Sequence, residues 1–545
     1  MPEAETTHPR LQRRAINPKN NDKSGDVSSL LKAALVAGLC WLFPIGETIA
    51  ADGGQSANLG DSARLTVPTR TDIELPNALN IEDVARYRLI FNAQDEAQWA
   101  DANQLIASLE NKLLLGHVQA QRLLHPQYRS TYRELAAWLA DYRDYPDAPR
   151  IYALAIKRKP AHVTLPELPS GGGKALPGGV KNATVEPPAE RWGQALESFR
   201  AKRYTTAARQ FEAVARQPKA SPWVVAAGAF WAARAHMLAA QPQQVTEWLR
   251  EAASHPLTFY GLLARETLGI DDSLDLRDPY LHAADGQVLI AHPASRRAIA
   301  LLQIDQPRRA EAELVAVYVA SSAPLARAVV ALANYGNMPS LSLRIGNRSI
   351  GLEPAERDAA VYPVPAWMPA GGYDVDRALV YALMRRESSF NPDARNGSGA
   401  SGLMQLMPGT ARAMAGKYLS SSKLFEPETN IALGQKYIRH LLADGAVKGN
   451  LIRLAAAYNA GPGNVAKWQR QSDQDDPLLF IESLPSRETR IFITNIMSDL
   501  WIYRMRLGQP NLSLAALASG RWPMYVAQDN LPARAVAAAK PSSSE

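Results

Sequence analysis

The sequence predicts a mainly α protein, in which an α-solenoid of stacked helix pairs is followed by a second helical domain. Alanine, leucine and arginine are abundant while runs of β-branched residues are few, and apolar residues recur at helical spacing. The chain has 545 residues, which is too long for one compact core. Hydrophobic residues make up 46% of it and charged residues 21%, as in ordinary globular proteins. We therefore expect several helical regions joined by linkers.

Residues 1–51 are predicted to be an export signal. The apolar run LLKAALVAGLCWLFPIG at 30–46 follows several basic residues, and an apolar core of about 14 residues is short for a membrane span but suits a signal peptide. Small residues at Ala50 and Ala51 offer a cleavage point, and an uncleaved membrane anchor is the alternative. Cys40 is the single cysteine, so no intrachain disulfide can form.

Composition then divides the chain into linkers and helical regions. Residues 52–80 are mostly polar and predict a disordered linker. From Ile81, the stretch IEDVARYRLIFNAQDEAQWADANQLIASL shows helical periodicity and opens a helical region at 81–168. The segment PSGGGKALPGGVKNATVEPP is too rich in glycine and proline for a helix or strand, so 169–189 is predicted to be a linker or insertion.

Residues 190–350 are predicted to form an α-superhelical domain of the tetratricopeptide kind. RWGQALESFRAKRYTTAARQFEAVARQ and AAGAFWAARAHMLAAQPQQVTEWLREAASH each have the pattern of two packed helices, and the second begins about 35 residues after the first. The aromatic residues of these helices recur at helical spacing, which indicates core positions rather than a sugar-binding platform. A proline-rich linker at 351–371 precedes the last domain at 372–510, and 511–545 is expected to be a C-terminal segment with a disordered tail.

Glu387 is the candidate catalytic residue of the last domain. DVDRALVYALMRRESSFNPDA is predicted to be a helix in which Glu387 shares a face with Val380 and Leu383 and lies in the last turn before an Asn-Pro pair. The negative end of a helix and partial burial both disfavour a carboxylate, so both raise its pKa toward the range of a general acid. The alternative is a solvated glutamate paired with Arg385 or Arg386.

Two glycine-containing loops are expected to complete a cleft around this glutamate. NGSGASG at 396–402 allows positive φ angles and close backbone approach, and Gln405 then interrupts an apolar run with hydrogen-bonding groups. LAAAYNAGPGNVAKW places Tyr458 and Asn459 at the end of an apolar helix, against another glycine turn. Both segments therefore deliver polar groups to one shared concavity.

These motifs, in this order, resemble the family-1 soluble lytic transglycosylases, which cleave bacterial peptidoglycan. The resemblance is carried by Glu387-Ser388, GLMQLMP, FEPETNIALGQKYIRHLL, AYNAGPG and IESLPSRETRIFI, and outside the last domain by HPLTFYGLLARETLG. It implies a lysozyme-like, mostly helical catalytic domain attached to an α-superhelix. It also implies a periplasmic lyase that cleaves the β-1,4 bond between N-acetylmuramic acid and N-acetylglucosamine without water.

The resemblance further implies the roles of matching residues. Glu387 would protonate the glycosidic oxygen and then take the proton of the muramoyl 6-hydroxyl, which closes a 1,6-anhydro ring while the substrate's N-acetyl group stabilises the intermediate. The implied substrate-binding residues are Ser388, Asn396, Met404, Gln405, Tyr458, Asn459 and Phe492. Phe492 stands where the family usually has tyrosine, which would shift the task of that hydroxyl onto Tyr458, and Asn396 stands where serine is common.

One carboxylate suffices for such a reaction, although ordinary glycosidases use two. Asp393 is close to Glu387 in sequence but is expected to be a solvated turn residue. Glu488, Thr489 and Arg490 are expected to support the cleft rather than to act in catalysis. Two other functions stay open: a hydrolase of the goose-lysozyme type that uses the same glutamate with water, and a non-catalytic scaffold that only binds peptidoglycan.

No cofactor, metal or nucleic acid is expected. Histidines do not pair with acids at ligand spacing in the last domain, and no phosphate-binding loop is present. A net charge of +7 without a dense basic stripe suits an anionic polymer but is weak support for nucleic acid. The expected partners are glycan strands of peptidoglycan, with cell-wall synthesis or secretion complexes as further candidates, and a membrane only if the signal is retained as an anchor.

Overall fold

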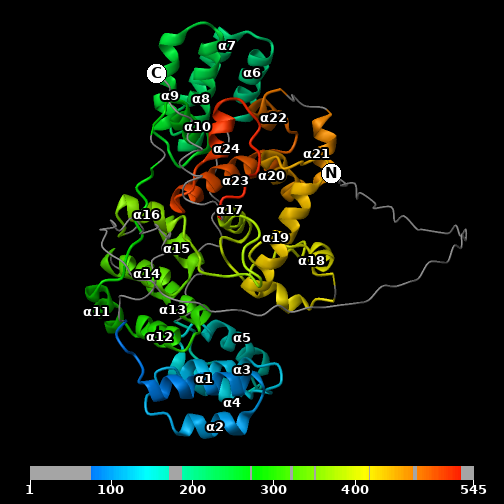
Figure 1. The fold of residues 1–545 in the computed structure, drawn as a ribbon. Helices are drawn as coiled ribbons and strands as arrows, with labels where there is room; N and C mark the ends of the chain where they lie inside the picture. The colour runs from blue at the N-terminus through cyan, green and yellow to red at the C-terminus, as the bar shows by residue number, and fades with distance from the viewer. Residues whose placement is uncertain are drawn as a thin grey trace, which may run out of the picture. The chain divides into compact units, whose positions relative to one another are not determined.

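The structure is a computed structural model that describes residues 75–170, 187–270, 273–319, 323–348, 351–416, 418–470 and 475–529. All of these residues belong to the second of two compact units, which runs from Arg64 to Glu545. Within them the chain forms 24 α-helices and one 3-10 helix, and no β-strand is found in this part of the chain (Figure 1). The predicted mainly α fold class is therefore confirmed. The predicted export signal lies outside the described residues.

The first helices pack into two small groups. These helices are α1 (Ile81–Asp95), α2 (Trp99–Ala107), α3 (Leu115–Leu124), α4 (Tyr132–Tyr142) and α5 (Ala148–Arg158). Helix α4 begins with a capping box, in which Thr131 and Glu134 satisfy each other's backbone N–H groups. Trp138 of α4 lies in a core formed with α3 and α5.

In the next five helices, each helix packs against the one that follows it. These helices are α6 (Ala189–Arg200), α7 (Tyr204–Ala215), α8 (Pro222–Leu238), α9 (Pro242–Ala253) and α10 (Phe259–Thr267). Helices α7 and α8 approach so closely that a Cβ on Gly228 would lie 2.6 Å from the backbone nitrogen of Ala215. Phe211 and Trp231 are fully buried between these helices, so the prediction that these aromatics are core residues is confirmed.

Six further helices lead to the last domain, and their core is shared with the start of the chain. These helices are α11 (Ala283–Ala291), α12 (Pro293–Gln303), α13 (Pro307–Val319), α14 (Ala323–Tyr335), α15 (Pro339–Gly346) and α16 (Pro354–Ala360). Tyr87 and Phe91 of α1 belong to the same buried cluster as Leu314 of α13 and Leu332 of α14. Segments that are more than two hundred residues apart in sequence are thus joined by one core.

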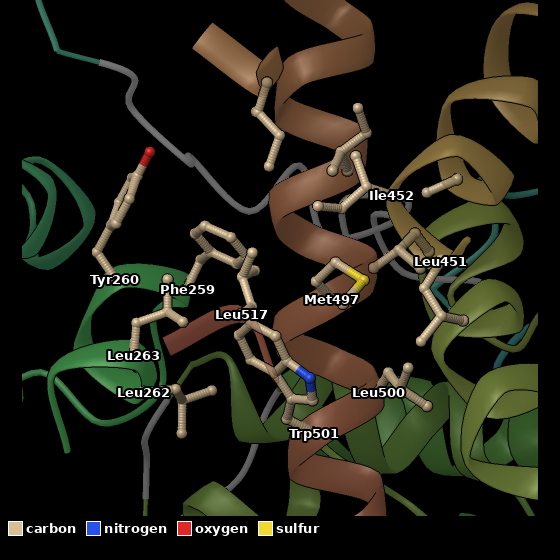
Figure 2. Packing of buried hydrophobic residues seen from close by; sticks show 14 of the residues in the cluster. Phe259, Tyr260, Leu262, Leu263, Leu451, Ile452, Met497, Leu500, Trp501 and Leu517 are labelled. Carbon is tan, nitrogen blue, oxygen red and sulfur yellow. The ribbon is translucent and has the colours of Figure 1, made fainter. Parts of the chain in front are cut away.

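The last domain is arranged around one long helix. Its helices are α17 (Arg377–Ser388), α18 (Pro408–Ala415), η1 (Ser421–Phe425), α19 (Pro427–Ala443), α20 (Leu451–Ala460), α21 (Pro462–Gln469), α22 (Pro477–Ser483), α23 (Arg487–Arg506) and α24 (Leu512–Ala518). Helix α23 packs against α17, α20 and α10. Figure 2 shows this packing: Phe259 and Leu262 of α10 face Trp501 of α23, and Leu451 and Ile452 of α20 lie on the other side.

The buried clusters do not follow the predicted domain order. Residues of α6 to α10 share one core with the last domain, whereas residues of α11 to α15 share another with α1 to α3. The predicted domain boundaries therefore stay predictions. None of the described helices is long and apolar enough to cross a membrane.

Candidate active site

Glu387 occupies the last turn of α17, as predicted, but the helix ends differently. Ser389 and Phe390 have φ angles of 52° and 60°, and the backbone N–H of Ser389 donates to the carbonyl oxygen of Met384. Two consecutive left-handed residues that are not glycine cost about 1–2 kcal/mol each. Phe390 is fully buried, so its packing holds the chain in this turn. The helix therefore stops before the Asn-Pro pair that was predicted to end it.

The environment of Glu387 favours its protonated form. The side chain is only partly exposed, and burial raises its pKa to about 8, with a further contribution from the negative charge of Glu488 on α23. The alternative that a neighbouring arginine neutralises Glu387 is wrong. Arg385 and Arg386 both pair with Asp499, a fully buried residue of α23.

Gln405 takes part in folding the loop that follows α17. Its Nε2 donates to the carbonyl oxygens of Ala394, at 3.0 Å, and Gly402, at 2.9 Å. Two backbone acceptors on the amide nitrogen fix the orientation of the side-chain amide. Gln405 is partly exposed, so the group that it can offer to a ligand is the Oε1 acceptor.

Asn430 of α19 holds the same loop and was missed from the sequence. It is fully buried, and its Oδ1 accepts from the backbone N–H of Met404 at 2.8 Å. Its Nδ2 donates to the carbonyl oxygens of Ser401, at 3.1 Å, and Leu424, at 2.8 Å. One side chain therefore joins the loop to η1. The signal that could have revealed it is a polar residue on the apolar face of FEPETNIALGQKYIRHLL.

The glycines of NGSGASG have different tasks. Gly402 has a φ of 77°, and a Cβ there would lie 2.1 Å from the carbonyl oxygen of Leu424 and 2.2 Å from Nδ2 of Asn430. At Gly397 a Cβ would meet nothing within 4 Å. Gly402 is thus needed for packing of the loop against η1 and α19, rather than for approach of a ligand.

Tyr458 connects this loop to the opposite helices. Its hydroxyl donates to the carbonyl oxygen of the buried Met404 at 2.8 Å. Its ring is nearly parallel to that of Phe492 on α23, with 6.4 Å between the ring centroids and 10° between the planes. Burial raises the pKa of Tyr458 well above its usual value, and the charges of Glu387 and Tyr437 add to this. Tyr458 therefore lies close to Glu387.

Asn459 is held by the first turn of α23. Oγ1 of Thr489 donates to Oδ1 of Asn459 at 2.8 Å, and Thr489 is itself bound to Ser486, which caps the helix. The predicted supporting role of this motif agrees with these bonds. Because the acceptor of Asn459 is used within the protein, its amide nitrogen is the group that it can offer to a ligand.

Ser388 and Asn396 make contacts within their own segments. The Ser388 hydroxyl donates to the carbonyl oxygen of Met384 at 3.1 Å and is buried. Asn396 lies in an exposed turn, where its Oδ1 accepts from the backbone N–H groups of Ser398 and Ala400. The structure thus brings Glu387, Met404, Tyr458 and Phe492 together, while the substrate-binding roles of all the predicted residues stay predictions. In the described part of the chain, no group of His, Cys, Asp and Glu is placed to hold a metal ion.

The described residues thus form packed helices joined to a helical domain in which one carboxyl group, that of Glu387, has a raised pKa. Comparison with known proteins indicates the class of the soluble lytic transglycosylases. Residues 367–481 match the family model of the Transglycosylase SLT domain. Over 157 residues the chain is 37% identical to the soluble lytic murein transglycosylases of Salmonella typhimurium and Escherichia coli. The aligned segment covers 28% of this chain and 24% of each relative.

The fold comparison extends beyond the matched domain. The crystal structure of the 70 kDa soluble lytic transglycosylase SLT70 from Escherichia coli superposes with a TM-score of 0.51 at 16% identity, covering 82% of this chain and 99% of that chain. The predicted superhelix with a lysozyme-like domain is therefore confirmed as the fold. The match to the Transglycosylase SLT domain model falls within the last helical domain, as the resemblance implied. The sequence match spans about a quarter of the length of the curated relatives.

Proposed function

We propose that the protein is a lytic transglycosylase that cleaves the β-1,4 bond between N-acetylmuramic acid and N-acetylglucosamine in peptidoglycan. The observation that carries this proposal is Glu387, whose pKa is raised to about 8 within a segment that matches the SLT domain. A carboxyl group with such a pKa is protonated at neutral pH and can donate its proton to a leaving oxygen. Its neighbours Arg385 and Arg386 are bound by Asp499, so neither of these two guanidinium groups pairs with the carboxylate form.

In the proposed reaction Glu387 acts twice. Its proton passes to the glycosidic oxygen as the bond to the muramoyl C1 breaks, and the N-acetyl group of the substrate stabilises the resulting charge. The Glu387 carboxylate then accepts the proton of the muramoyl 6-hydroxyl, whose oxygen bonds to C1 and closes the 1,6-anhydro ring. The negative charge of Glu488 favours this second step, because it makes the carboxylate a stronger base.

The surrounding side chains fit the recognition of a neutral sugar. Oε1 of Gln405 and Nδ2 of Asn459 are an acceptor and a donor suited to hydroxyl and acetamido groups. The parallel rings of Tyr458 and Phe492 form an apolar wall near Glu387. Phe492 lacks a hydroxyl, so Tyr458 supplies the phenolic group of this wall, and Met404 orients it.

The substrate class also sets the proposed location and partners. The matched relatives are named for murein, which is peptidoglycan, and we extend that substrate to this chain. A peptidoglycan-cleaving enzyme acts outside the cytoplasm, in keeping with the export signal predicted at the N-terminus. Glycan strands are the proposed partner. Cell-wall synthesis or secretion complexes stay predictions.

Mass analysis of muropeptides tests the proposal. Purified peptidoglycan treated with the full-length protein should release muropeptides with 1,6-anhydromuramic ends, each lighter by one water than a hydrolysed product. The Glu387→Gln variant keeps the shape of the side chain but cannot donate a proton, so turnover should fall by about 10³-fold or more. The variant should still sediment with insoluble peptidoglycan and should retain its circular dichroism spectrum.

Each alternative has its own signature in the same experiment. Reducing muramic ends would identify a hydrolase of the goose-lysozyme type. Binding to peptidoglycan without any released product from the wild type would identify a scaffold. Turnover that survives Glu387→Gln would show that another residue is the acid.

A further inference from the structure

One carboxylate of the last domain, that of Glu482, binds two helices of the superhelix. This residue lies near the end of α22. Oε2 of Glu482 accepts from Nε1 of Trp192 on α6 at 2.9 Å, and Oε1 accepts from the hydroxyl of Tyr260 on α10 at 2.6 Å. Both donors are buried, with Trp192 8% and Tyr260 5% exposed. Two donors from different superhelical helices therefore meet on the two oxygens of one carboxylate.

Two more contacts surround this bond. Nη2 of Arg234 on α8 pairs with Asp476, which caps α22, at 2.6 Å. Nη2 of Arg200 at the end of α6 donates to Oγ of Ser483 at 2.8 Å. The seven residues of α22 are thus held at both ends by the superhelix.

An apolar core lies directly beside this polar contact. Phe259, the neighbour of Tyr260, stacks on Trp501 of α23 with 5.3 Å between the ring centroids and 16° between the planes. Figure 2 shows Tyr260 at the edge of this core, with its hydroxyl directed away from the Phe259–Trp501 pair. Replacement of the Tyr260 hydroxyl alone therefore leaves the apolar packing in place.

The segment from Glu482 to the cleft is short and is held by its own hydrogen bonds. Glu488 comes only six positions after Glu482 in the sequence. Nη1 of Arg490 donates to the carbonyl oxygen of Leu484 at 2.7 Å, and Oγ of Ser486 accepts from the backbone N–H of Thr489 at 3.2 Å. A displacement of α22 is therefore transmitted to the first turn of α23.

We infer that Glu482 is a positioning residue for the cleft, and that Trp192 and Tyr260 of the superhelix hold it in place. The inference rests on the proposed function. The first turn of α23 carries Thr489, which orients Asn459, and Glu488, which lies close to Glu387. By fixing α22, the superhelix fixes where these groups meet the substrate. The superhelix is thus a structural part of the cleft and not merely a domain attached to it.

Tyr260→Phe is the central test, because it removes one donor to Glu482 and keeps the ring. In the full-length protein, the first turn of α23 should then shift relative to α17, and the rate of muropeptide release should fall by about ten-fold. Glu482→Gln has the same shape but turns an amide N–H toward one of the two donors, so it should have the same effect. The two substitutions combined should cost less than the product of the single effects, since both break the same contact.

The pH profile separates positioning from loss of stability. Among the described residues, the titratable groups that interact with Glu387 are Glu488 on α23 and Tyr458 on α20, while Arg385 and Arg386 on its own helix are bound by Asp499. Burial and the Glu488 charge both raise the pKa of Glu387, and both weaken if the first turn of α23 moves away. The alkaline limb of the rate profile should therefore shift to lower pH in Tyr260→Phe and Glu482→Gln.

A matched control exists in the first helical region, at residues 81–168. Tyr128 lies in the connection between α3 and α4, and its hydroxyl donates to Oε1 of Glu134 on α4 at 2.5 Å, in a contact that does not involve the last domain. Tyr128→Phe should show the wild-type rate and the wild-type alkaline limb, even if it lowers the melting temperature.

Three results would overturn the inference. The first is a wild-type rate and limb in folded Tyr260→Phe and Glu482→Gln, and the second is an equal effect of Tyr128→Phe. The third is a rate that falls only in proportion to the unfolded fraction, without a shift of the limb. Failure of the proposed function looks different, because the wild type would then yield no anhydromuropeptides. If it yielded reducing ends instead, their rate of release would serve as the same readout.

Discussion

Arg386 and Asp499 form a two-point ion pair across the interface of α17 and α23. Nε and Nη2 of Arg386 lie 2.5 Å and 2.8 Å from the two carboxylate oxygens of Asp499, which is fully buried. Arg385 donates to the same carboxylate at 3.1 and 3.2 Å. Both basic neighbours of Glu387 are therefore bound to α23. Their positive charges are neutralised by Asp499 and do not pair with the Glu387 carboxylate.

Asp499→Asn should destabilise the protein strongly. Removal of this acid leaves two largely buried guanidinium groups without their counterion, which typically costs about 3–5 kcal/mol. Urea unfolding should show a lower midpoint with an unchanged slope. The freed positive charges should also lower the pKa of Glu387, so the alkaline limb of the rate profile should move to lower pH. An unchanged midpoint would show that the ion pair is not a stabilising contact.

Asp393→Asn should leave the reaction almost intact. Asp393 is exposed and pairs with Arg308 of α13 at 3.0 Å, a surface contact worth about 1 kcal/mol or less. A substrate hydroxyl replaces the second carboxylate in the proposed mechanism, so turnover should stay within about two-fold of the wild type. Kinetics of muropeptide release beside Glu387→Gln would check this. A fall of about 100-fold or more in Asp393→Asn would point to a second catalytic carboxylate.

The helices were predictable from the sequence because each follows a local pattern of apolar residues. Apolar spacing and small residues indicated packed pairs, and Phe211 and Trp231 are buried between them. What the pattern could not show is which helices meet. The partner of Arg386 lies 113 positions away, and α1 shares its core with α13 and α14. Such contacts depend on how the chain turns in its linkers, where helical periodicity carries no information.

The candidate site was only partly predictable, and for a related reason. Glu387 and Tyr458 are chemical groups in motifs, and the structure brings them close together. Asn430 was missed because its partners are backbone atoms of segments 6 to 29 residues away. Every residue has the same backbone atoms, so the sequence does not show which of them bind Asn430. The left-handed turn at Ser389 and Phe390 that ends α17 was also missed, because it is held by the burial of Phe390 rather than by local preference.

Gly402→Ala should be far more damaging than Gly397→Ala, although both glycines lie in NGSGASG. An alanine at 402 would need a φ of 77°, and its Cβ would lie 2.1 Å from the carbonyl oxygen of Leu424. The hydrogen bonds by which Asn430 joins the loop to η1 would therefore have to break. We expect a loss of about 2–4 kcal/mol in stability and a large loss of turnover. At 397 space is open, and the effect should stay within about 0.5 kcal/mol. Chemical unfolding of both variants would compare them directly, and equal effects would contradict the packing role of Gly402.

Glu387→Gln should stabilise the protein, and the gain should depend on pH. The pKa of Glu387 is about 8 in the folded state against 4.5 for an ordinary glutamate, so the folded state binds a proton that the unfolded state releases. The contribution of Glu387 to stability is therefore fully present below about pH 4.5 and is lost as pH rises through 8. Glutamine does not titrate and escapes this loss.

The difference between variant and wild type should therefore be small at pH 4.5 and grow toward pH 8.5. A shift of this size would correspond to about 5 kcal/mol at 1.36 kcal/mol for each pKa unit, but the partial exposure of Glu387 reduces the expected gain to about 2 kcal/mol. Melting temperatures across this pH range would measure it.

Glu134→Gln provides the opposite control, because the hydrogen bonds of Tyr128 and Thr131 more than offset burial and lower the pKa of Glu134. The stability that Glu134 contributes is present above about pH 4.5 and is lost as pH falls through its lowered pKa. Glu134→Gln should therefore destabilise the protein more at pH 8.5 than in acid. If Glu387→Gln followed the same trend as Glu134→Gln, Glu387 would be an ordinary ionised glutamate, and its assignment as the proton donor would fail.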